Sequence, residues 1–242
     1  LVHGAWHGGW CWRRVAERLE ATGARVLTPT LTGCGERAHL MSPETGLATH
    51  IQDIVAVIET GELTQVHLCG HSYGGMVITG VCDRLKDRMA SVLYLDAALP
   101  SDGETMITQS PGIMPQAAAA TEAGLRALAP DGVAILVFPD VTIFGVAGGG
   151  EDEAWLKRRL TPHPFRTWTD PISLSTGGSD GLRRTYAHCV DPVLTMASFG
   201  AHYARLQDDP TWTTATLPTG HDAMITRPDL VTDLILQQLS DG

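Results

Sequence analysis

The sequence has 242 residues, and its 17 Lys and Arg against 27 Asp and Glu give a formal net charge of −10. A hydrophobic fraction of 43% and a charged fraction of 18% are those of a globular protein, and the length is enough for one large domain. The sequence has no long basic stretch, which excludes nucleic acid and anionic membrane surfaces as expected partners. No apolar run approaches the length of a membrane-spanning helix.

Cysteine use favours a reducing compartment. The cysteines are odd in number, far apart and mostly inside apolar segments, which argues against a disulfide framework, so we expect a cytoplasmic protein. They are Cys11, Cys34, Cys69, Cys82 and Cys189. Histidines are scattered, and no His or Cys group has the spacing of metal ligands, so neither a metal nor another cofactor is expected. Leu1 already lies in a strand pattern, from which we expect further residues before it in the natural chain.

The first predicted elements alternate between strands and helices. Residues 1–2 end a strand, residues 3–10 form a glycine-rich loop, and a helix follows to about Glu20. Residues 25–29 are predicted as a second strand. The apolar spacing of residues 50–60 indicates a helix.

A Gly-His-Ser-Tyr-Gly pentad at residues 70–74 stands between two apolar stretches. The run that ends at Cys69 is predicted as a buried parallel strand, and the residues after Gly75 as a helix that continues to about Lys86. A chain that reverses from strand to helix this sharply strains its central residue, and the flanking glycines give it room. The pattern predicts a nucleophile elbow, with the Ser72 hydroxyl above the carboxyl end of the strand.

Residues 90–100 are a strongly apolar predicted strand with a single acid, Asp96, at its carboxyl end. A carboxylate rarely stands in such a run without a partner. The alternation of strands and helices up to this point indicates an α/β fold with a mostly parallel sheet flanked by helices. Ligands of such folds lie at the carboxyl ends of the strands.

The pattern changes between residues 101 and 181, where prolines interrupt two predicted helices, near 116–128 and 151–160. This segment is too long and too regular for a linker, so we predict a cap inserted over the sheet. The α/β core would then consist of residues 1–100 and 182–242, and its second part adds strands over 182–189 and 211–217 and a closing helix over 228–239.

A serine nucleophile needs a base, because a free hydroxyl is a weak nucleophile. His221 stands in the loop after the last predicted strand, from which it would lean over Ser72, and we predict it as the base. The oxyanion of a tetrahedral intermediate needs two N–H donors. We expect them from Tyr73, directly after the nucleophile, and from Ala5 in the glycine-rich loop.

Three separated motifs carry a family resemblance. HGAWHGGW at residues 3–10, GHSYGG at 70–75 and GHDAM at 220–224 together resemble the α/β-hydrolase superfamily. More narrowly, they resemble the branch that holds plant methyl esterases of the salicylate-binding type, hydroxynitrile lyases and small bacterial carboxylesterases. The resemblance implies an α/β-hydrolase fold with a cap, Ser72 as nucleophile and His221 as its base.

Two positions depart from the lyases of that branch. The lyases carry a Thr after the His-Gly of the first loop and a Lys directly after the catalytic His, where it steadies the cyanide leaving group. This chain has Ala5 and Asp222 there. An anionic side chain cannot take over the electrostatic role of that lysine, so these positions favour an esterase.

The triad acid has two candidates. Plant members of the branch place an Asp at the position of Val193, and Asp191 stands two residues away. The other candidate is Asp96, because residues 93–97 resemble the site from which haloalkane dehalogenases supply their acid. A carboxylate from either place would fulfil the orienting role. We favour Asp96, since a buried carboxylate needs a partner more than a loop Asp before proline does, and Asp191 stays the alternative.

The expected function is hydrolysis of carboxylic esters through an acyl-enzyme intermediate, with a small-molecule ester as partner. Ser72, His221 and Asp96 would form the triad, and Trp6 and His71 would contact a small, partly apolar substrate. Two other functions stay open: a C–C or C–O lyase or cyclase acting on a biosynthetic intermediate, and a non-catalytic small-ligand receptor. A homodimer is also left open.

Overall fold

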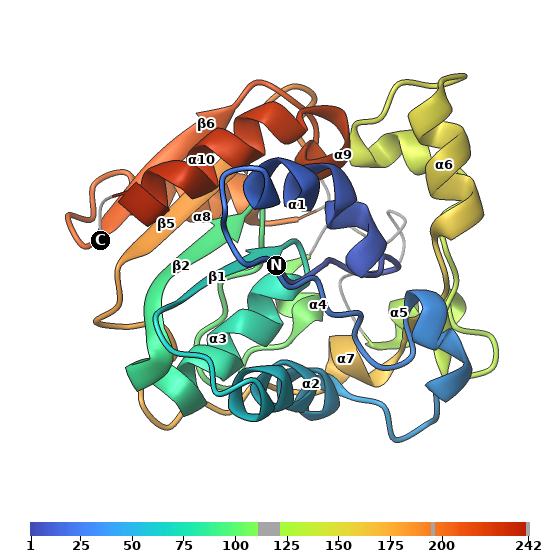
Figure 1. Cartoon of the computed structure of the whole chain (residues 1–242). Coiled ribbons are helices and arrows are strands. Elements are labelled where there is room, and N and C mark those ends of the chain that lie inside the picture. The colour runs from blue at the N-terminus through green and yellow to red at the C-terminus, as the bar shows by residue number, and fades with distance from the viewer. Residues whose placement is uncertain (111–121, 195–196, 241–242) are drawn as a thin grey trace.

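A computed structural model describes residues 1–110, 122–194 and 197–240. Its centre is a parallel sheet in the order β1-β2-β5-β6 (Figure 1). The strands are β1 Val66–His71, β2 Met89–Leu95, β5 Arg184–Cys189 and β6 Trp212–Leu217. Strand β2 is apolar and almost wholly buried, because helices cover both faces of a parallel sheet. The predicted α/β fold with a mostly parallel sheet is confirmed.

Helices surround this sheet. Helix α3 packs on β1 and β2, α8 packs on β5 and β6, α2 lies against α3, and α1 lies beside α10. Figure 1 shows α1 and α10 together on the near side of the strands. Their bounds are α1 Arg13–Glu20, α2 Leu47–Thr60, α3 Gly74–Leu85, α8 Phe199–Leu206, α9 Ala223–Thr226 and α10 Pro228–Ser240, with 3-10 turns at η1 Gly9–Trp12, η2 Gly35–Leu40 and η3 Lys86–Arg88. No helix of the described residues is long and apolar enough to cross a membrane.

The strand predicted over residues 25–29 does not form. A strand needs a ladder of hydrogen bonds between backbone pairs. In this segment the carbonyl of Leu27 instead accepts a hydrogen bond from the amino group of Leu1 (2.8 Å). The strand end predicted at residues 1–2 is reduced to one bridge, between Val2 and Gly70. The prediction for residues 1–2 therefore changes little, because Val2 still lies beside β1.

Residues 101–181, the predicted cap, contain short elements, of which α5 and α6 lie on the right in Figure 1 and α4 lies near the middle. They are α4 Met106–Gln109, α5 Glu122–Ala127, β3 Ala134–Ile135, η4 Val141–Phe144, α6 Glu151–Arg159, β4 His163–Pro164 and α7 Arg166–Thr169. The helix predicted near 151–160 is confirmed as α6. The one predicted near 116–128 is seen only as α5, because residues 111–121 lie outside the described residues.

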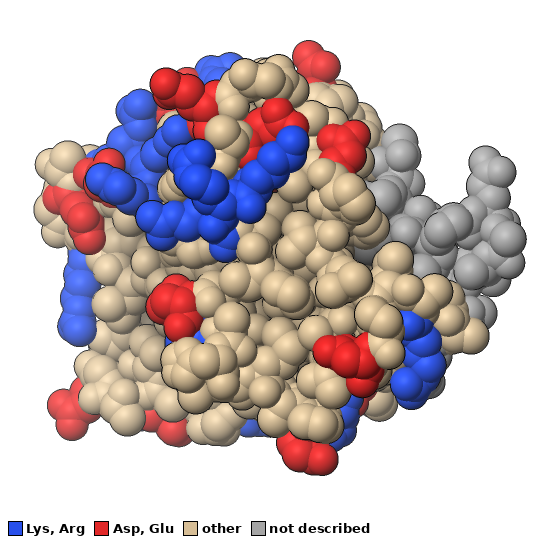
Figure 2. Space-filling view, turned by 90° about the vertical axis from the view of Figure 1, so that its right-hand side faces the viewer, with Lys and Arg blue, Asp and Glu red and all other residues tan. Residues whose placement is uncertain are grey.

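Helix α6 is fastened to the core through Arg14 of α1. Its guanidinium donates to Asp152 (2.6 Å) and to the carbonyl of Ile225 (2.6 Å), and it lies 5.1 Å from the ring of Trp155. Figure 2 shows Lys and Arg side chains gathered in the upper part of the face in view, with Asp and Glu around them. Arg14 thus joins three parts of the chain, α1, α6 and the segment after His221.

The register of the sheet sets the position of the site. Leu95 at the end of β2 pairs with His71 of β1 on one side and with Ala187 of β5 on the other. The residues that follow these three are Ser72, Asp96 and His188. They therefore lie side by side at the carboxyl ends of three neighbouring strands.

Candidate active site

Ser72 occupies the sharp turn between β1 and α3, as predicted from the pentad. Its φ is 55°, in the left-handed region that residues other than glycine rarely adopt. The backbone approaches closely here: a Cβ on Gly70 would lie 2.8 Å from the carbonyl oxygen of Gly74, and one on Gly74 would lie 2.9 Å from that of Val2. Only glycine fits at both positions, and the turn lifts Ser72 above the strand.

Asp96 follows β2 and is fully buried, also with a positive φ of 43°. Oδ2 accepts a hydrogen bond from His221 Nδ1 (2.7 Å), and Oδ1 accepts from His188 Nδ1 (2.7 Å) and from the amide of Cys189 (3.2 Å). Burial by itself would raise the pKa of this carboxyl, but the hydrogen bonds from the two histidines outweigh it and lower the pKa to about 2. Asp96 is therefore ionised at neutral pH.

His221 stands in the loop between β6 and α9 and is 2% exposed. Besides its bond to Asp96, its ring stacks on Phe199 at 5.6 Å with an interplanar angle of 17°. Asp191, the alternative acid, is exposed, and its amide donates to the carbonyl of Thr219 (3.0 Å). Of the two candidate acids, the structure brings Asp96 to His221 and leaves Asp191 at the surface.

Sequence reasoning missed His188. It is the penultimate residue of β5, lies beside Asp96 at the edge of the sheet and donates to the second carboxylate oxygen. The sequence did hold a signal: a polar residue stands near the carboxyl end of each apolar strand, Asp96 directly after β2 and His188 next to the last residue of β5. The carboxyl ends of parallel strands meet at the same edge of a sheet. That signal becomes usable only when the two strands are known to be neighbours, because residues 96–183 separate them in the chain.

The two amides expected to bind an oxyanion lie next to the serine. A Cβ on Gly4 would lie 2.8 Å from Cβ of Ser72, so the loop that carries Ala5 passes directly over the elbow. Across the described residues, neither the Ala5 amide nor the Tyr73 amide donates a hydrogen bond. Both N–H groups are thus available to an incoming oxygen.

A small pocket opens at this point and is lined by Ser72, His221 and Ala5. Its other walls are almost entirely apolar and include Trp6, Met106, Phe144, Trp168 and Phe199. No hydrogen bond to the Ser72 hydroxyl is found in the described part of the chain. Catalytic hydrogen bonds often tighten only when substrate is bound.

Of the two predicted substrate contacts, Trp6 lines the pocket and His71 does not. His71 is fully buried, and its Nε2 donates to the backbone carbonyl of His221 (2.9 Å). Burial lowers the pKa of His71 to about 3, so its ring is neutral. The expected substrate contact of His71 is therefore corrected. The His71 side chain holds the loop of His221 through this hydrogen bond, because a residue that precedes the elbow points back into the sheet.

Trp6 is held by the segment 101–181 through three hydrogen bonds. Its amide donates to His163 Nδ1 (3.3 Å), its carbonyl accepts from the amide of Thr161 (3.0 Å), and its indole donates to the carbonyl of Ile135 (3.3 Å). These contacts hold it at a φ of 63°. Trp6 directly follows Ala5, so the segment also fixes the loop that carries the Ala5 amide.

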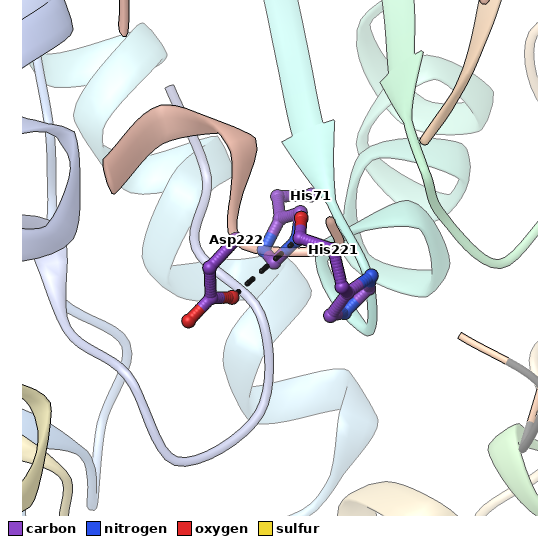
Figure 3. Close-up of side chains that lie close together, drawn as sticks. All are labelled: His71, His221 and Asp222. Atoms are coloured by element: carbon purple, nitrogen blue, oxygen red, sulfur yellow. Dashed lines mark hydrogen bonds and ion pairs between the residues drawn. The ribbon is translucent and has the colours of Figure 1, made fainter. Parts of the chain in front are cut away.

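His71, His221 and Asp222 approach one another closely enough to suggest a metal site, and Figure 3 shows how they lie. Their potential ligand atoms are within 4.8 Å of one another. His71 Nε2 carries a proton, since it donates to a carbonyl, and His221 Nδ1 is engaged by Asp96. The group is also fully buried, so it is better suited to hold the loop of His221 than a cation.

Comparisons with known proteins agree with this fold. The model of the "Alpha/beta hydrolase family" matches residues 1–234. The chain is 42% identical over 234 residues to a "Carbendazim hydrolyzing esterase" of Nocardioides sp. (strain SG-4G), covering 95% of this chain and 94% of the relative. It is 31% identical over 105 residues to a "Putative methylesterase 14, chloroplastic" of Arabidopsis thaliana, covering 43% of this chain and 30% of the relative.

A solved structure extends the likeness to the whole fold. An extracellular alpha/beta-hydrolase from a Paenibacillus species, described as homologous to tobacco salicylic acid binding protein 2, superimposes with a TM-score of 0.82 at 22% identity, over 98% of this chain and 96% of that one. The expected likeness to plant methyl esterases and bacterial esterases is confirmed, and so is the class, a carboxylesterase-type enzyme. The chain belongs to the alpha/beta hydrolase family.

Proposed function

We propose that this protein is a serine esterase that hydrolyses small, partly apolar carboxylic esters through an acyl-enzyme intermediate. One observation carries the proposal: Asp96 holds His221 by a 2.7 Å hydrogen bond, and His221 lines the same pocket as Ser72. An imidazole oriented by a buried carboxylate beside a serine on an elbow is the arrangement needed to activate that serine.

The proposed reaction has two halves. His221 Nε2 takes the proton of Ser72, whose oxygen attacks the ester carbonyl, and the negative oxygen of the tetrahedral intermediate accepts from the amides of Ala5 and Tyr73. The intermediate collapses, the bond to the alcohol breaks, and His221 returns the proton to the leaving oxygen. A water molecule then repeats the sequence on the acyl-enzyme, which releases the acid and restores the serine. Asp96 stabilises the imidazolium in both halves.

The pocket supports a substrate with a flat or apolar group. Four aromatic side chains stand around it, and Trp6 packs at 5.7 Å from Trp168 and 6.0 Å from Phe144. Walls of this kind favour aromatic rings. The relatives include an esterase that hydrolyses carbendazim and a putative methylesterase, which suggests methyl esters as the substrate class. The aromatic walls favour a flat aromatic group in the rest of the substrate.

Other expectations remain part of this proposal. We infer that residues 101–181 act as a cap over the pocket, since Trp6, the residue after Ala5, bonds to this segment. All five cysteines are free and buried, which supports a cytoplasmic protein. Asp222, at the position of the lyase lysine, is fully buried and lies outside the pocket lining, so this side chain offers no positive charge to a cyanide leaving group.

The test is hydrolysis of p-nitrophenyl acetate and butyrate, methyl esters of aromatic acids, and carbendazim by the wild type and by Ser72→Ala. The intact mass after treatment with a fluorophosphonate probe is measured in parallel. We expect turnover and a single label in the wild type, and neither in the variant. A wild type that is inert to every ester and to the probe would sink the proposal and favour a receptor. Turnover without an acyl-enzyme burst would favour a lyase or cyclase.

A further inference from the structure

A second buried Asp–His pair lies behind the pocket. His7 stands two residues after Ala5 in the glycine-rich loop, and Asp222 directly follows His221. Their side chains are 1% and 0% exposed, and His7 Nε2 lies 3.1 Å from Asp222 Oδ2. The other ring nitrogen of His7, Nδ1, lies 2.7 Å from the carbonyl oxygen of Ala5.

The two partners define the protonation of the His7 ring. A carbonyl oxygen only accepts, so Nδ1 carries a proton, and an ionised carboxylate only accepts, so Nε2 carries one as well. Burial alone would lower the pKa of His7, but the charge of Asp222 and the hydrogen bonds to Asp222 and Ala5 raise it above the usual histidine value. Burial alone would raise the pKa of Asp222, but His7 holds it below its usual value. The pair is therefore ionic.

The surroundings favour a cation at this place. The ring of His7 stacks on the face of Trp10 at 5.5 Å with an interplanar angle of 26°. An aromatic face stabilises an imidazolium. Asp222 Oδ1 has no hydrogen-bond partner in the described residues, so the carboxylate depends on His7 for its compensation.

The pair joins two loops that must act on the same carbonyl group. His7 donates a hydrogen bond to the Ala5 carbonyl, and Asp222 is the residue that follows His221 in the chain. We propose that the His7–Asp222 ion pair is a positioning device, which fixes the loop of the Ala5 amide relative to the loop of His221. This inference rests on the proposed esterase function. Displacing a reacting group by about 1 Å can cost on the order of 10²-fold in rate, so a rigid tie between these loops matters.

The experiment compares His7→Gln, Asp222→Asn and the double variant with the wild type. Each single variant replaces one charged member of the pair by a neutral amide and leaves the other charge buried without its counter-charge, so the two loops are held less firmly. We expect kcat to fall by about 10²-fold while KM changes little. Affinity for a trifluoromethyl ketone, which mimics the tetrahedral intermediate, should fall in parallel with kcat/KM. In the double variant the two neutral amides can hydrogen-bond to each other, so its kcat should be no lower than that of the less active single variant.

A matched control separates positioning from stability. Asp83, buried on α3, accepts hydrogen bonds from the amides of Ser175, Thr176 and Gly178, away from the pocket. Asp83→Asn should lower Tm and leave kcat and the affinity for the ketone unchanged. If His7→Gln and Asp222→Asn behave like Asp83→Asn, the pair is only structural and the inference is overturned.

Nuclear magnetic resonance of ring nitrogens tests the pair without using activity. At about pH 8, where ordinary histidines are neutral, both nitrogens of His7 should be protonated in the wild type and in Ser72→Ala, and one should lose its proton in Asp222→Asn. A singly protonated His7 in the wild type would overturn the inference even if ester hydrolysis is established. If the doubly protonated ring is found but the wild type hydrolyses no ester, the proposed function fails, and the positioning role falls with it.

Discussion

His221 and His7 each hydrogen-bond a buried carboxylate at this site, yet their rings are left in opposite chemical situations. His221 gives Nδ1 to Asp96 (2.7 Å), and in the described chain no hydrogen bond engages its Nε2. His7 has both nitrogens engaged, one by Ala5 O at 2.7 Å and one by Asp222 at 3.1 Å. A ring with a free nitrogen can take up and return a proton, whereas a ring between two acceptors keeps its protons.

The comparison shows that two buried carboxylate–histidine pairs of one site can differ in what their histidines have left to offer a substrate. What distinguishes the Asp96 pair is that His221 lines the pocket with Ser72. What distinguishes the Asp222 pair is that His7 lies behind the loop of Ala5, packed against Trp10. In the proposed mechanism the first pair transfers protons, and in the further inference the second holds a fixed charge.

The largest expected effect comes from neutralising Asp96. In Asp96→Asn the ring of His221 loses its orienting acceptor and the charge that stabilises the imidazolium, so we expect kcat to fall by about 10⁴-fold. Steady-state ester hydrolysis measures it. Asp191→Asn is the matched control, because Asp191 lies exposed at the surface, and it should keep wild-type activity. A large loss in Asp191→Asn with an active Asp96→Asn would reverse the assignment of the acid.

A smaller effect is expected from His188, the second donor to Asp96. In His188→Ala the Oδ1 oxygen keeps only the amide of Cys189, at 3.2 Å, so the carboxylate is held less firmly. Loss of one hydrogen bond to a charged group predicts about a tenfold fall in kcat. His188→Asn places an amide N–H near the position of Nδ1 and should restore most of the activity. Equal losses in the two variants would speak against a positioning role for His188.

The smallest effect concerns stability in acid. The pKa of Asp96 is lowered to about 2 in the folded protein, against about 3.9 for an unfolded Asp. A lowered carboxyl pKa contributes stability above the unfolded value, and this contribution is lost as the pH falls through the folded value. The stability difference between the wild type and Asp96→Asn should thus be constant above about pH 5 and shrink between about pH 4 and pH 2. Denaturant unfolding across that range measures it, and a difference independent of pH would contradict the lowered pKa.

Local sequence was sufficient for most elements of the core. The apolar runs of β1 and β2, the glycines of the elbow and the helical spacing of α2 are dictated by neighbours in the chain, and each element forms in the predicted region. The predicted bounds differ by a few residues, most at β2, which ends at Leu95 and not at residue 100. The prediction of a strand at residues 25–29 was wrong because a strand also depends on residues distant in the chain. Its composition suits a strand, but a strand exists only where a partner offers a ladder of hydrogen bonds.

The candidate site divides in the same way. The positions of Ser72 and His221 follow from motifs, because the elbow and the loop after the last strand are local features. The sequence left Asp96 and Asp191 as alternatives and placed His71 at the substrate. The structure brings Asp96 to His221 and turns His71 inward, towards the carbonyl of His221. The first outcome depends on which strands are neighbours, and the second on where the loop of His221 lies relative to β1.

The sequence by itself determined the α/β alternation, the elbow that presents Ser72 and the family to which the chain belongs. Only the tertiary structure decided that two histidines share Asp96 and that His7 and Asp222 join two loops. The physical reason is range. Turn geometry and strand burial depend on adjacent residues, whereas these hydrogen bonds link residues about 90 to 215 positions apart and exist only once the register of the sheet is set.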